Sequence, residues 1–346
     1  MGDLRPATTT WPGDELVSRV TGATDRDWFY ESGRQSVREI AAVLSLAGRS
    51  LESFSSILDF GSGCGRILLW LEDVAKGAAV HGVDIDRQAV AWADQHLPFA
   101  TVSANQPAPP LAHPDGYFDL VYSHSVFTHI DERLQDQWLR ELRRVTRPGG
   151  LLVLSIHGEH AFAEFEAGAL DAGGDPSSLR ERLVRDGIVF HRDDIWVDGP
   201  FPDFYHTTFH APWYVFGHWG RYFTVRALVS RGSLGYQDFV LLERTPELPR
   251  QVSLSPVAGA SRRARPPDPD GSVWSALERA MSLVEGGPDL QSPASHGRLS
   301  VAFRRSILRV LRHYSEHDQR VHEAMLDVVR HLATHPDDPT RSGSGP

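Results

Sequence analysis

Short apolar runs alternate with segments of helical periodicity along the first half of the chain. The runs SSILDF, AAVHGVDI, FATVSA, FDLVYSHS and LLVLSIH are predicted strands, and apolar residues between them recur every three or four positions. Helices are expected over about 66–76, 87–96 and 132–147. Strands that alternate with helices favour βαβ crossovers, so we expect an α/β fold with a doubly wound, mostly parallel sheet that carries its ligand at the carboxyl edge.

Segments on either side of this alternation complete the predicted sheet. Before it, residues 35–47 place apolar side chains on one helical face, which is typical of a helix that covers a sheet edge. After it, YFTVRALVS and QDFVLLER flank a turn that contains glycine, a pattern that predicts an antiparallel hairpin. We therefore assign residues 1–50 to a leader and capping helix, and residues 51–245 to one α/β domain.

The C-terminal third has a different composition. Residues 246–271 are rich in Pro, Arg and Ser and predict a linker. Over 272–336, apolar residues recur at helical spacing, so we expect an additional helical segment that packs on the main domain or joins two chains in a homodimer. Residues 337–346 have a composition typical of disorder.

Composition narrows the classes of partner. The chain has 346 residues and a formal net charge of -10, which gives no general cationic field for nucleic acid. Its single cysteine, Cys64, cannot form an intramolecular disulfide, and its start lacks the basic and apolar runs of a signal peptide. Since no stretch approaches a membrane span, we expect a cytoplasmic protein whose partner is a small molecule or a glycan.

The stretch ILDFGSGCGR, from Ile57 to Arg66, places three glycines at a strand-to-helix turn. A turn without side chains lets a ligand approach the backbone and the free N–H groups of the helix start. A dinucleotide fingerprint would need glycine where Arg66 stands, and a P-loop would need Lys and then Ser or Thr after the last glycine. Both phosphate-binding turns are disfavoured, although a nicotinamide-dependent oxidoreductase stays an alternative.

Four segments, in this order, resemble the motifs of class I S-adenosylmethionine-dependent methyltransferases. LDFGSGCGR resembles the first motif and GVDID the second, YFDLVYSHSVFTHI the fourth strand with its loop, and RPGGLLVLSIHG the fifth strand with its preceding turn. The likeness covers about residues 50–157, and 201–244 more loosely. It implies a Rossmann-like methyltransferase fold with a seven-stranded sheet, S-adenosyl-L-methionine as the cofactor, and methyl transfer as the activity.

The resemblance assigns the methionine end of the cofactor to the first motif. S-adenosylmethionine carries a sulfonium, an amino acid end and a ribose but no phosphate, so an acid beside the turn is tolerable. Asp59 would orient the methionine amino group, directly or through water. Gly61, Gly63 and Gly65 would let the methionine chain lie on the backbone.

The ends of the later strands would hold the rest of the cofactor. By the same resemblance, Asp84 would accept both ribose hydroxyls, and Ile85 would pack against the adenine. The family commonly has an aspartate for the adenine amino group after the third strand, where this chain has Asn105, whose amide oxygen can still accept that hydrogen bond. Ser123 and His124 would line the cleft near the transferred methyl group.

Other roles stay open for several residues of these motifs. Asp84 could cap the helix that follows, although Asp86 is better placed for that cap. Cys64, inside the glycine turn, is typical of a small filler rather than a nucleophile. We expect Arg66 to form a salt bridge or to serve in packing.

Histidines supply the candidate general bases. Methyl transfer is an in-line displacement, so the enzyme must align donor and acceptor and, for a hydroxyl acceptor, remove its proton. His157, which ends the fifth predicted strand, is the first candidate for the catalytic base, and His210 is the second. His206 and His210 have the spacing of a helical metal pair, but Pro212 and the lack of a third ligand disfavour it, so we expect no metal.

The predicted activity is methyl transfer to an oxygen of a small molecule or glycan. Methyltransferases of nucleic-acid amino groups usually carry Asn or Asp, two prolines and an aromatic residue after the fourth strand, whereas YSHS stands here. The aromatic-rich stretch 201–220 is expected to form a substrate pocket or lid, or else to pack in the core. A non-catalytic binding or assembly protein that kept the fold is a further alternative. Such a protein would be expected to have a damaged glycine turn, whereas the turn of this sequence is intact.

Overall fold

The computed structural model describes residues 6–8, 10–192 and 202–248. The predicted helical segment over 272–336, the tail over 337–346 and all but the first three residues of the predicted linker lie outside the described residues. Among the residues described, no helix has the length and apolar character needed to cross a membrane.

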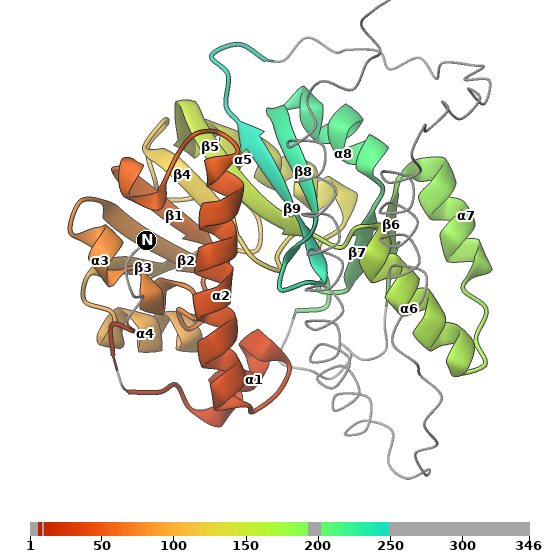
Figure 1. The fold of residues 1–346 in the computed structure, drawn as a ribbon, viewed down its shortest axis with the longest axis horizontal. Helices are drawn as coiled ribbons and strands as arrows, with labels where there is room; N and C mark the ends of the chain where they lie inside the picture. The colour runs from red at the N-terminus through yellow and green to blue at the C-terminus, as the bar shows by residue number, and fades with distance from the viewer. Residues whose placement is uncertain (1–5, 9, 193–201, 249–346) are drawn as a thin grey trace, which may run out of the picture. The chain divides into compact units, whose positions relative to one another are not determined.

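A seven-stranded sheet forms the centre of the described part, in the order β3-β2-β1-β4-β5-β9-β8 (Figure 1). Neighbouring strands from β3 to β5 pair in parallel, whereas β9 is antiparallel to both β5 and β8. The doubly wound, mostly parallel sheet of the Rossmann-like methyltransferase type is therefore confirmed, together with its closing hairpin. The strands are β1 (Ser56–Phe60), β2 (Ala79–Asp84), β3 (Ala100–Ala104), β4 (Phe118–Ser123), β5 (Thr146–Ile156), β8 (Thr224–Ser233) and β9 (Gln237–Glu243).

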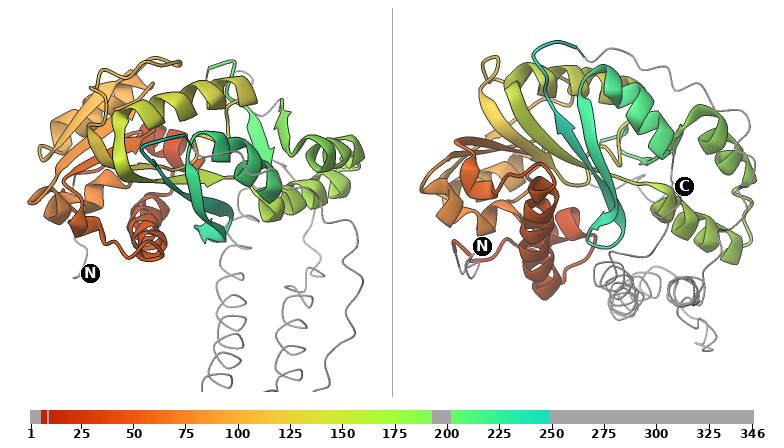
Figure 2. Two further views of the ribbon diagram at one scale, coloured as in Figure 1. Left: turned by 90° about the horizontal axis from the view of Figure 1, so that it is seen from above. Right: turned by 45° about the horizontal axis from the view of Figure 1, so that its top comes forward.

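Successive residues of the central strands enter two apolar cores on opposite faces of the sheet. In β1, Ile57 belongs to the core that holds side chains of α2 and α4, and Leu58 belongs to the core of α5 and α8. Figure 2 shows α2 and α5 on opposite sides of the sheet. These helices are α2 (Arg26–Ser45), α4 (Arg87–His96), α5 (Glu132–Val145) and α8 (Pro212–His218), with the turn η4 (Trp219–Arg221) after α8 and η1 (Leu51–Ser53) before β1.

The segment after the glycine turn differs from the continuous helix predicted over 66–76. It forms the 3₁₀ turn η2 (Leu68–Trp70) and the short helix α3 (Glu72–Ala75). None of the side chains from Ile67 to Leu71 is more than 4% exposed. A regular surface helix buries one face only, so a tighter turn buries this unbroken apolar run.

Residues 159–191 contain elements that the sequence pattern did not reveal. Helices α6 (Glu159–Asp171) and α7 (Ser177–Asp186) precede β6 (Ile188–His191), which pairs with β7 (Thr207–His210) in a separate two-stranded sheet. Phe162, Leu183 and Phe209 help to form a small core of this insertion.

The N-terminal helix α1 (Asp14–Thr21) packs against the glycine turn. Val17 shares a small core with Phe29, Cys64 and Ala89. The Cys64 thiol is fully buried 3.9 Å from the Leu16 carbonyl oxygen, and burial raises its pKa to about 12. A thiol in this state fills space and is not a nucleophile at neutral pH.

Candidate functional site

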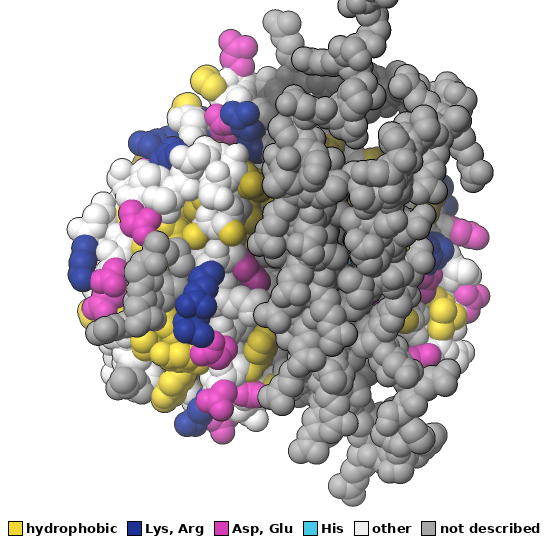
Figure 3. All heavy atoms as spheres, viewed as in Figure 1, with side chains coloured by type: hydrophobic (Ala, Val, Ile, Leu, Met, Phe, Trp, Pro, Cys, Tyr) yellow, Lys and Arg dark blue, Asp and Glu magenta, His cyan; other side chains and the backbone are white. Residues whose placement is uncertain are grey.

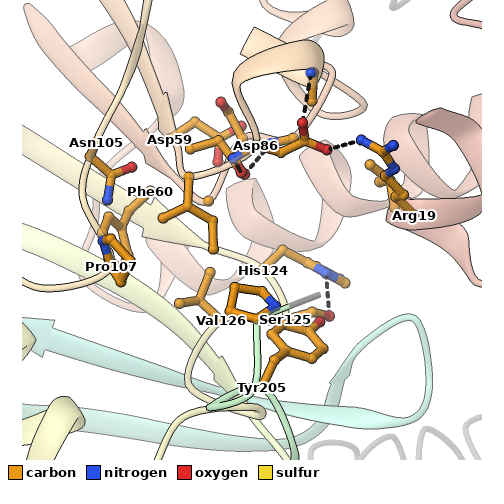
Figure 4. A pocket seen from close by; sticks show the side chains of 18 of the residues that line it. Arg19, Asp59, Phe60, Asp86, Asn105, Pro107, His124, Ser125, Val126 and Tyr205 are labelled. Carbon is orange, nitrogen blue, oxygen red and sulfur yellow. Dashed lines mark hydrogen bonds and ion pairs between the residues drawn. The ribbon is translucent and has the colours of Figure 1, made fainter. Parts of the chain in front are cut away.

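A cavity of about 630 Å³ lies at the carboxyl edge of the sheet, where β1, β2, β3 and β4 end (Figure 4). Along this edge, the loops that follow the four strands lie in the spatial order β3, β2, β1, β4, which is the order of the strands in the sheet. The cavity therefore extends from the end of β3 past those of β2 and β1 to the end of β4. Residues predicted from the sequence that line it are Asp59, Gly61, Gly63, Asp84, Ile85, Asn105 and His124.

The glycine turn has the backbone conformation that its composition predicts. Gly61, Gly63 and Gly65 have φ values of 85°, 53° and 85°, in the left-handed region that favours glycine. A side chain at Gly65 would come within 2.6 Å of Leu97 in the loop after α4. Gly65 does not line the cavity, so packing accounts for its glycine, and its contact with the cofactor stays a prediction.

Asp84 presents its carboxylate at the end of β2. One oxygen accepts a hydrogen bond from the Gly63 N–H (2.7 Å) and the other from the Asp86 N–H (2.8 Å). Burial raises the pKa of Asp84. The competing role as helix cap belongs to Asp86, whose side chain accepts the N–H groups of Gln88 and Ala89 at the start of α4.

Asp59 is a buried acid on the cavity wall. Its side chain is 2% exposed, and its Oδ2 has no hydrogen-bond partner among the described residues. Burial raises the pKa of Asp59 to about 8, while the Tyr122 hydroxyl and the Arg66 guanidinium oppose that rise. A partly desolvated carboxyl without a partner is costly unless a ligand completes it.

Arg66 lines the same cavity and is only 5% exposed. Its guanidinium donates to the Ser36 hydroxyl at 3.2 Å. Of the two roles expected for Arg66, its burial agrees with packing, since no carboxylate oxygen of the described residues lies within 4.0 Å of it. Burial lowers the pKa of Arg66 to about 10, and the group stays charged at neutral pH.

Asn105 offers a hydrogen-bond acceptor at the far end of the cavity. Its amide nitrogen donates to the Gln106 carbonyl at 2.7 Å, which leaves its Oδ1 buried with no partner in the described part of the chain. Ile85, which follows β2, lies on the same wall. This end combines an apolar side chain with an unsatisfied amide oxygen.

His124 lies at the other end of the cavity, just past β4. Its ring nitrogens are 3.0 Å from the Ser125 hydroxyl and 2.8 Å from the Ser233 hydroxyl of β8. Gln237 of β9 donates to the Ser125 hydroxyl at 2.8 Å. Ser125 has a φ of 61°, a strained conformation for a residue with a side chain. Burial lowers the pKa of His124 well below its usual range, so the imidazole is neutral.

The two histidines predicted as bases lie next to each other but do not line the cavity. The His210 N–H donates to the His157 carbonyl at 2.8 Å, and the His210 ring is 3.0 Å from the Gln135 amide oxygen. His157 is 6% exposed and His210 fully buried, and burial lowers the pKa of both to about 3. Ser123 is also buried and outside the cavity wall. The roles given to these three residues stay predictions.

Part of the cavity wall comes from α1, a segment in which sequence reasoning identified no site residue. Arg19 of α1 lines the cavity and forms an ion pair with Asp86 (2.8 Å). Figure 4 shows the Arg19 side chain directed toward Asp86. The apolar face of DELVSRVT could have indicated α1, but nothing local in it predicts contact with the loop after β2.

The aromatic-rich stretch contributes both to the cavity wall and to the cores, and its role as a substrate pocket stays a prediction. Phe204 and Tyr205 line the cavity, and Tyr205 stacks on His129 with ring centroids 4.0 Å apart. Phe209 and Trp219 are buried in the cores. In the described part of the chain, no group of three or more His, Cys, Asp or Glu side chains is arranged to hold a metal ion.

Comparison with known proteins identifies a domain within this fold. Residues 58–154 match the family model of a methyltransferase domain. Among solved structures, a methyltransferase dependent on S-adenosylmethionine from Methanosarcina mazei is 21% identical, with a TM-score of 0.38, over 56% of this chain and 93% of that one. Another from Aquifex aeolicus is 16% identical, with a TM-score of 0.39, over 67% of this chain and 98% of that one.

Proposed function

We propose that this chain, whose residues 58–154 match the family model of a methyltransferase domain, uses S-adenosylmethionine as its cofactor and transfers a methyl group to an oxygen of a small molecule or a glycan. The observation that carries the proposal is a row of hydrogen-bond acceptors along one cavity. Asn105, Asp84 and Asp59 follow the strand order β3, β2, β1, and each presents an oxygen at the wall.

These acceptors match the donors of the cofactor from one end to the other. The unpartnered Oδ1 of Asn105 accepts the adenine amino group, and Ile85 packs on the base. The carboxylate of Asp84 accepts the ribose hydroxyls, and the unpartnered Oδ2 of Asp59 accepts from the methionine ammonium. Gly61 lines the cavity without a side chain, so the methionine chain lies along its backbone.

The end of β4 then faces the methyl group and the acceptor. When bound, S-adenosylmethionine supplies an electrophilic methyl group. His124 is our candidate for the general base in place of His157 and His210, because of these three only His124 lines the cavity. The acceptor proton passes through the Ser125 hydroxyl, on the same wall, to the neutral imidazole. Phe204 and Tyr205 supply an apolar surface for the acceptor.

Charge supports a substrate other than nucleic acid. The net charge is -10, and on the face drawn in Figure 3 the acidic and basic side chains of the described residues are interspersed. A nucleic-acid surface would gather its cations in one field.

Calorimetric titration tests the cofactor assignment. We expect saturable binding of S-adenosylmethionine and none of NAD, and we expect Asp84→Ala to weaken the former at least about 100-fold because it removes both ribose acceptors. Asp94→Ala is the matched control, since Asp94 lies exposed on the same helix that follows β2. Saturable binding of NAD alone would establish the oxidoreductase alternative instead.

A further inference from the structure

The hairpin of β8 and β9 reaches the end of β4 through one cross-strand pair. Ser233 of β8 lies opposite Gln237 of β9 in the antiparallel register. The Ser233 hydroxyl is 2.8 Å from His124 Nε2, and the Gln237 amide donates to the Ser125 hydroxyl at 2.8 Å. Two facing residues of the hairpin thus hold the two neighbouring residues that are proposed to move the acceptor proton.

The backbone of the hairpin is irregular around Ser233. The register of β8 against β9 shifts between Val229 and Ser233. Arg231 and Leu234 have φ values of 54° and 53°, in the left-handed region that residues with side chains disfavour. Bulges and strained residues of this kind are common beside functional sites, where they re-aim a side chain. The side chain that this irregular backbone directs is that of Ser233, which is fully buried.

Two acids hold the strained turn in place. Asp238 accepts the Arg231 N–H at 2.8 Å, and Glu39 of α2 accepts the Leu234 N–H at 2.9 Å. The second hydrogen bond fastens the turn to α2, a helix that packs on the sheet. The position of Ser233 is therefore supported from both sides, as a group that must be pre-organised requires.

The donors and acceptors of this hydrogen-bonded chain determine which ring nitrogen of His124 carries the proton. The Gln237 amide nitrogen can only donate, so the Ser125 oxygen accepts from it and keeps its own proton to donate. His124 Nδ1, 3.0 Å from the Ser125 oxygen, accepts that proton (Figure 4). Because the imidazole is neutral, its one proton then lies on Nε2, which donates to the Ser233 hydroxyl.

We propose that Ser233 and Gln237 are positioning residues, which hold His124 as the tautomer with its proton on Nε2 and so keep Nδ1 ready to accept a proton through Ser125. The role of His124 as base rests on the proposed function. When the acceptor oxygen bonds to the methyl carbon and the carbon–sulfur bond breaks, the acceptor proton moves to the Ser125 oxygen. The proton of Ser125 moves at the same time to Nδ1, which leaves His124 as an imidazolium.

The hydrogen bond to Ser233 strengthens as the proton moves. In the resting protein it joins two neutral groups, whereas its donor is a cation once His124 has accepted the proton. Hydrogen bonds with one charged partner are about twice as strong as neutral ones. An interaction that strengthens along the reaction speeds the chemical step, so the hydroxyl of Ser233 should matter more for turnover than for cofactor binding.

Nitrogen-15 NMR of the histidine rings tests the assigned tautomer without any acceptor. A protonated ring nitrogen and an unprotonated one differ in chemical shift, and the His124→Gln variant identifies which signals belong to His124. We expect one tautomer, with Nε2 protonated, in the unaltered protein. Ser233→Ala and Gln237→Met should each give a mixture of both tautomers, because each removes one of the hydrogen bonds that fix the proton.

Rates of labelled methyl transfer into a small-molecule extract test the consequence of this positioning. Ser233→Ala should lower turnover about 10- to 100-fold and change the affinity for S-adenosylhomocysteine less than about twofold, because Ser233 does not line the cavity. Ser233→Thr keeps the hydroxyl and should restore most of the rate. Ser230→Ala is the matched control, since Ser230 lies exposed on the same strand and hydrogen-bonds to Asp238 in the same hairpin. It should leave the tautomer and the rate unaltered.

The outcomes separate this proposal from the one on which it rests. A proton on Nδ1 of His124 in the unaltered protein, or a tautomer that Ser233→Ala and Gln237→Met leave unchanged, would overturn the positioning role. Equal losses of rate in Ser233→Ala and Ser230→Ala would overturn it as well, since they would report a loosened hairpin. An unaltered protein that shows the expected tautomer but transfers no methyl group would overturn the proposed function instead.

Discussion

At the scale of single residues, the cavity contains buried polar groups that a ligand can hydrogen-bond and that destabilise the protein when no ligand is bound. Asp59 buries a carboxyl oxygen without a partner, and Asn105 buries an amide oxygen in the same state. Each unsatisfied group costs about 1–3 kcal/mol relative to one that is hydrogen-bonded. A ligand that hydrogen-bonds to both oxygens therefore stabilises the folded protein. A loss of stability in the free protein is common at functional sites.

The raised pKa of Asp59 predicts that cofactor binding releases a proton. In the free protein the pKa is about 8, so the carboxyl is mostly protonated at pH 7. Contact with an ammonium favours the ionised form, so binding at pH 7 expels up to one proton, and affinity rises by up to about tenfold per pH unit until about pH 8. Calorimetry in buffers of different ionisation enthalpy measures this release. Asp59→Asn should abolish it, and an unaltered protein that releases no proton would contradict the assignment.

Rates of methyl transfer by three variants test which histidine is the general base. His124→Gln should lower methyl transfer about 10²- to 10⁴-fold with little change in affinity for S-adenosylhomocysteine, because it removes a general base and not a cofactor contact. His157→Gln and His210→Gln serve as comparisons, since neither residue lines the cavity. Labelled methyl transfer into a small-molecule extract of a deletion strain, which retains the unmethylated acceptor, measures the rate. A loss confined to His157→Gln would restore the base predicted from the sequence.

At the scale of elements, α1 closes one wall of the cavity. Arg19 pairs with Asp86 at 2.8 Å, and Val20 would be 2.8 Å from any side chain placed at Gly63. The helix thus contacts both the loop after β2 and the glycine turn. Its hold on the loop is a single ion pair that is partly exposed to solvent.

Loosening this contact should speed the release of the cofactor. We expect Arg19→Met to raise the dissociation rate of S-adenosylhomocysteine about three- to tenfold, and to change the free energy of unfolding by less than about 1 kcal/mol, as for other partly exposed ion pairs. Stopped-flow fluorescence follows the release. Arg34→Met, which breaks an ion pair with Glu31 on α2, should leave the rate unaltered. An equal change in both variants would mean that the effect is general loosening.

Which elements and contacts could be predicted from the sequence depends on whether the pattern that encodes them lies within one short segment. The apolar runs of β1 to β5 and the full extent of α4 follow from local periodicity, and Asp84 and Asn105, which the resemblance to the family motifs singled out, line the cavity. The hydrogen bond between His124 and Ser233 joins residues 109 positions apart, and no local pattern contains it. The helices of the insertion were missed because they bury few residues, Ala161 and Phe162 in α6 and Leu183 in α7, and so show no marked apolar face.

At the scale of the whole molecule, the described part has the features of a self-sufficient domain. Two cores cover opposite faces of an open sheet of seven strands, and described residues from both sides of the glycine turn line the cavity. Cofactor binding should therefore depend little on the residues that follow. The homodimer predicted from the helical periodicity of residues 272–336 is a separate proposal, tied to that segment.

Shortening the chain after residue 248 tests both proposals at once. We expect the full chain to have twice its 38.5 kDa mass by light scattering, and the shortened chain to have the mass of one copy, because the apolar helical stripe that would join two copies is gone. The shortened chain should bind S-adenosylhomocysteine within about threefold of the full chain, since it keeps every described residue that lines the cavity. A full chain that weighs one copy would rule out the dimer. Loss of binding by a folded, shortened chain would show instead that the segment completes the site.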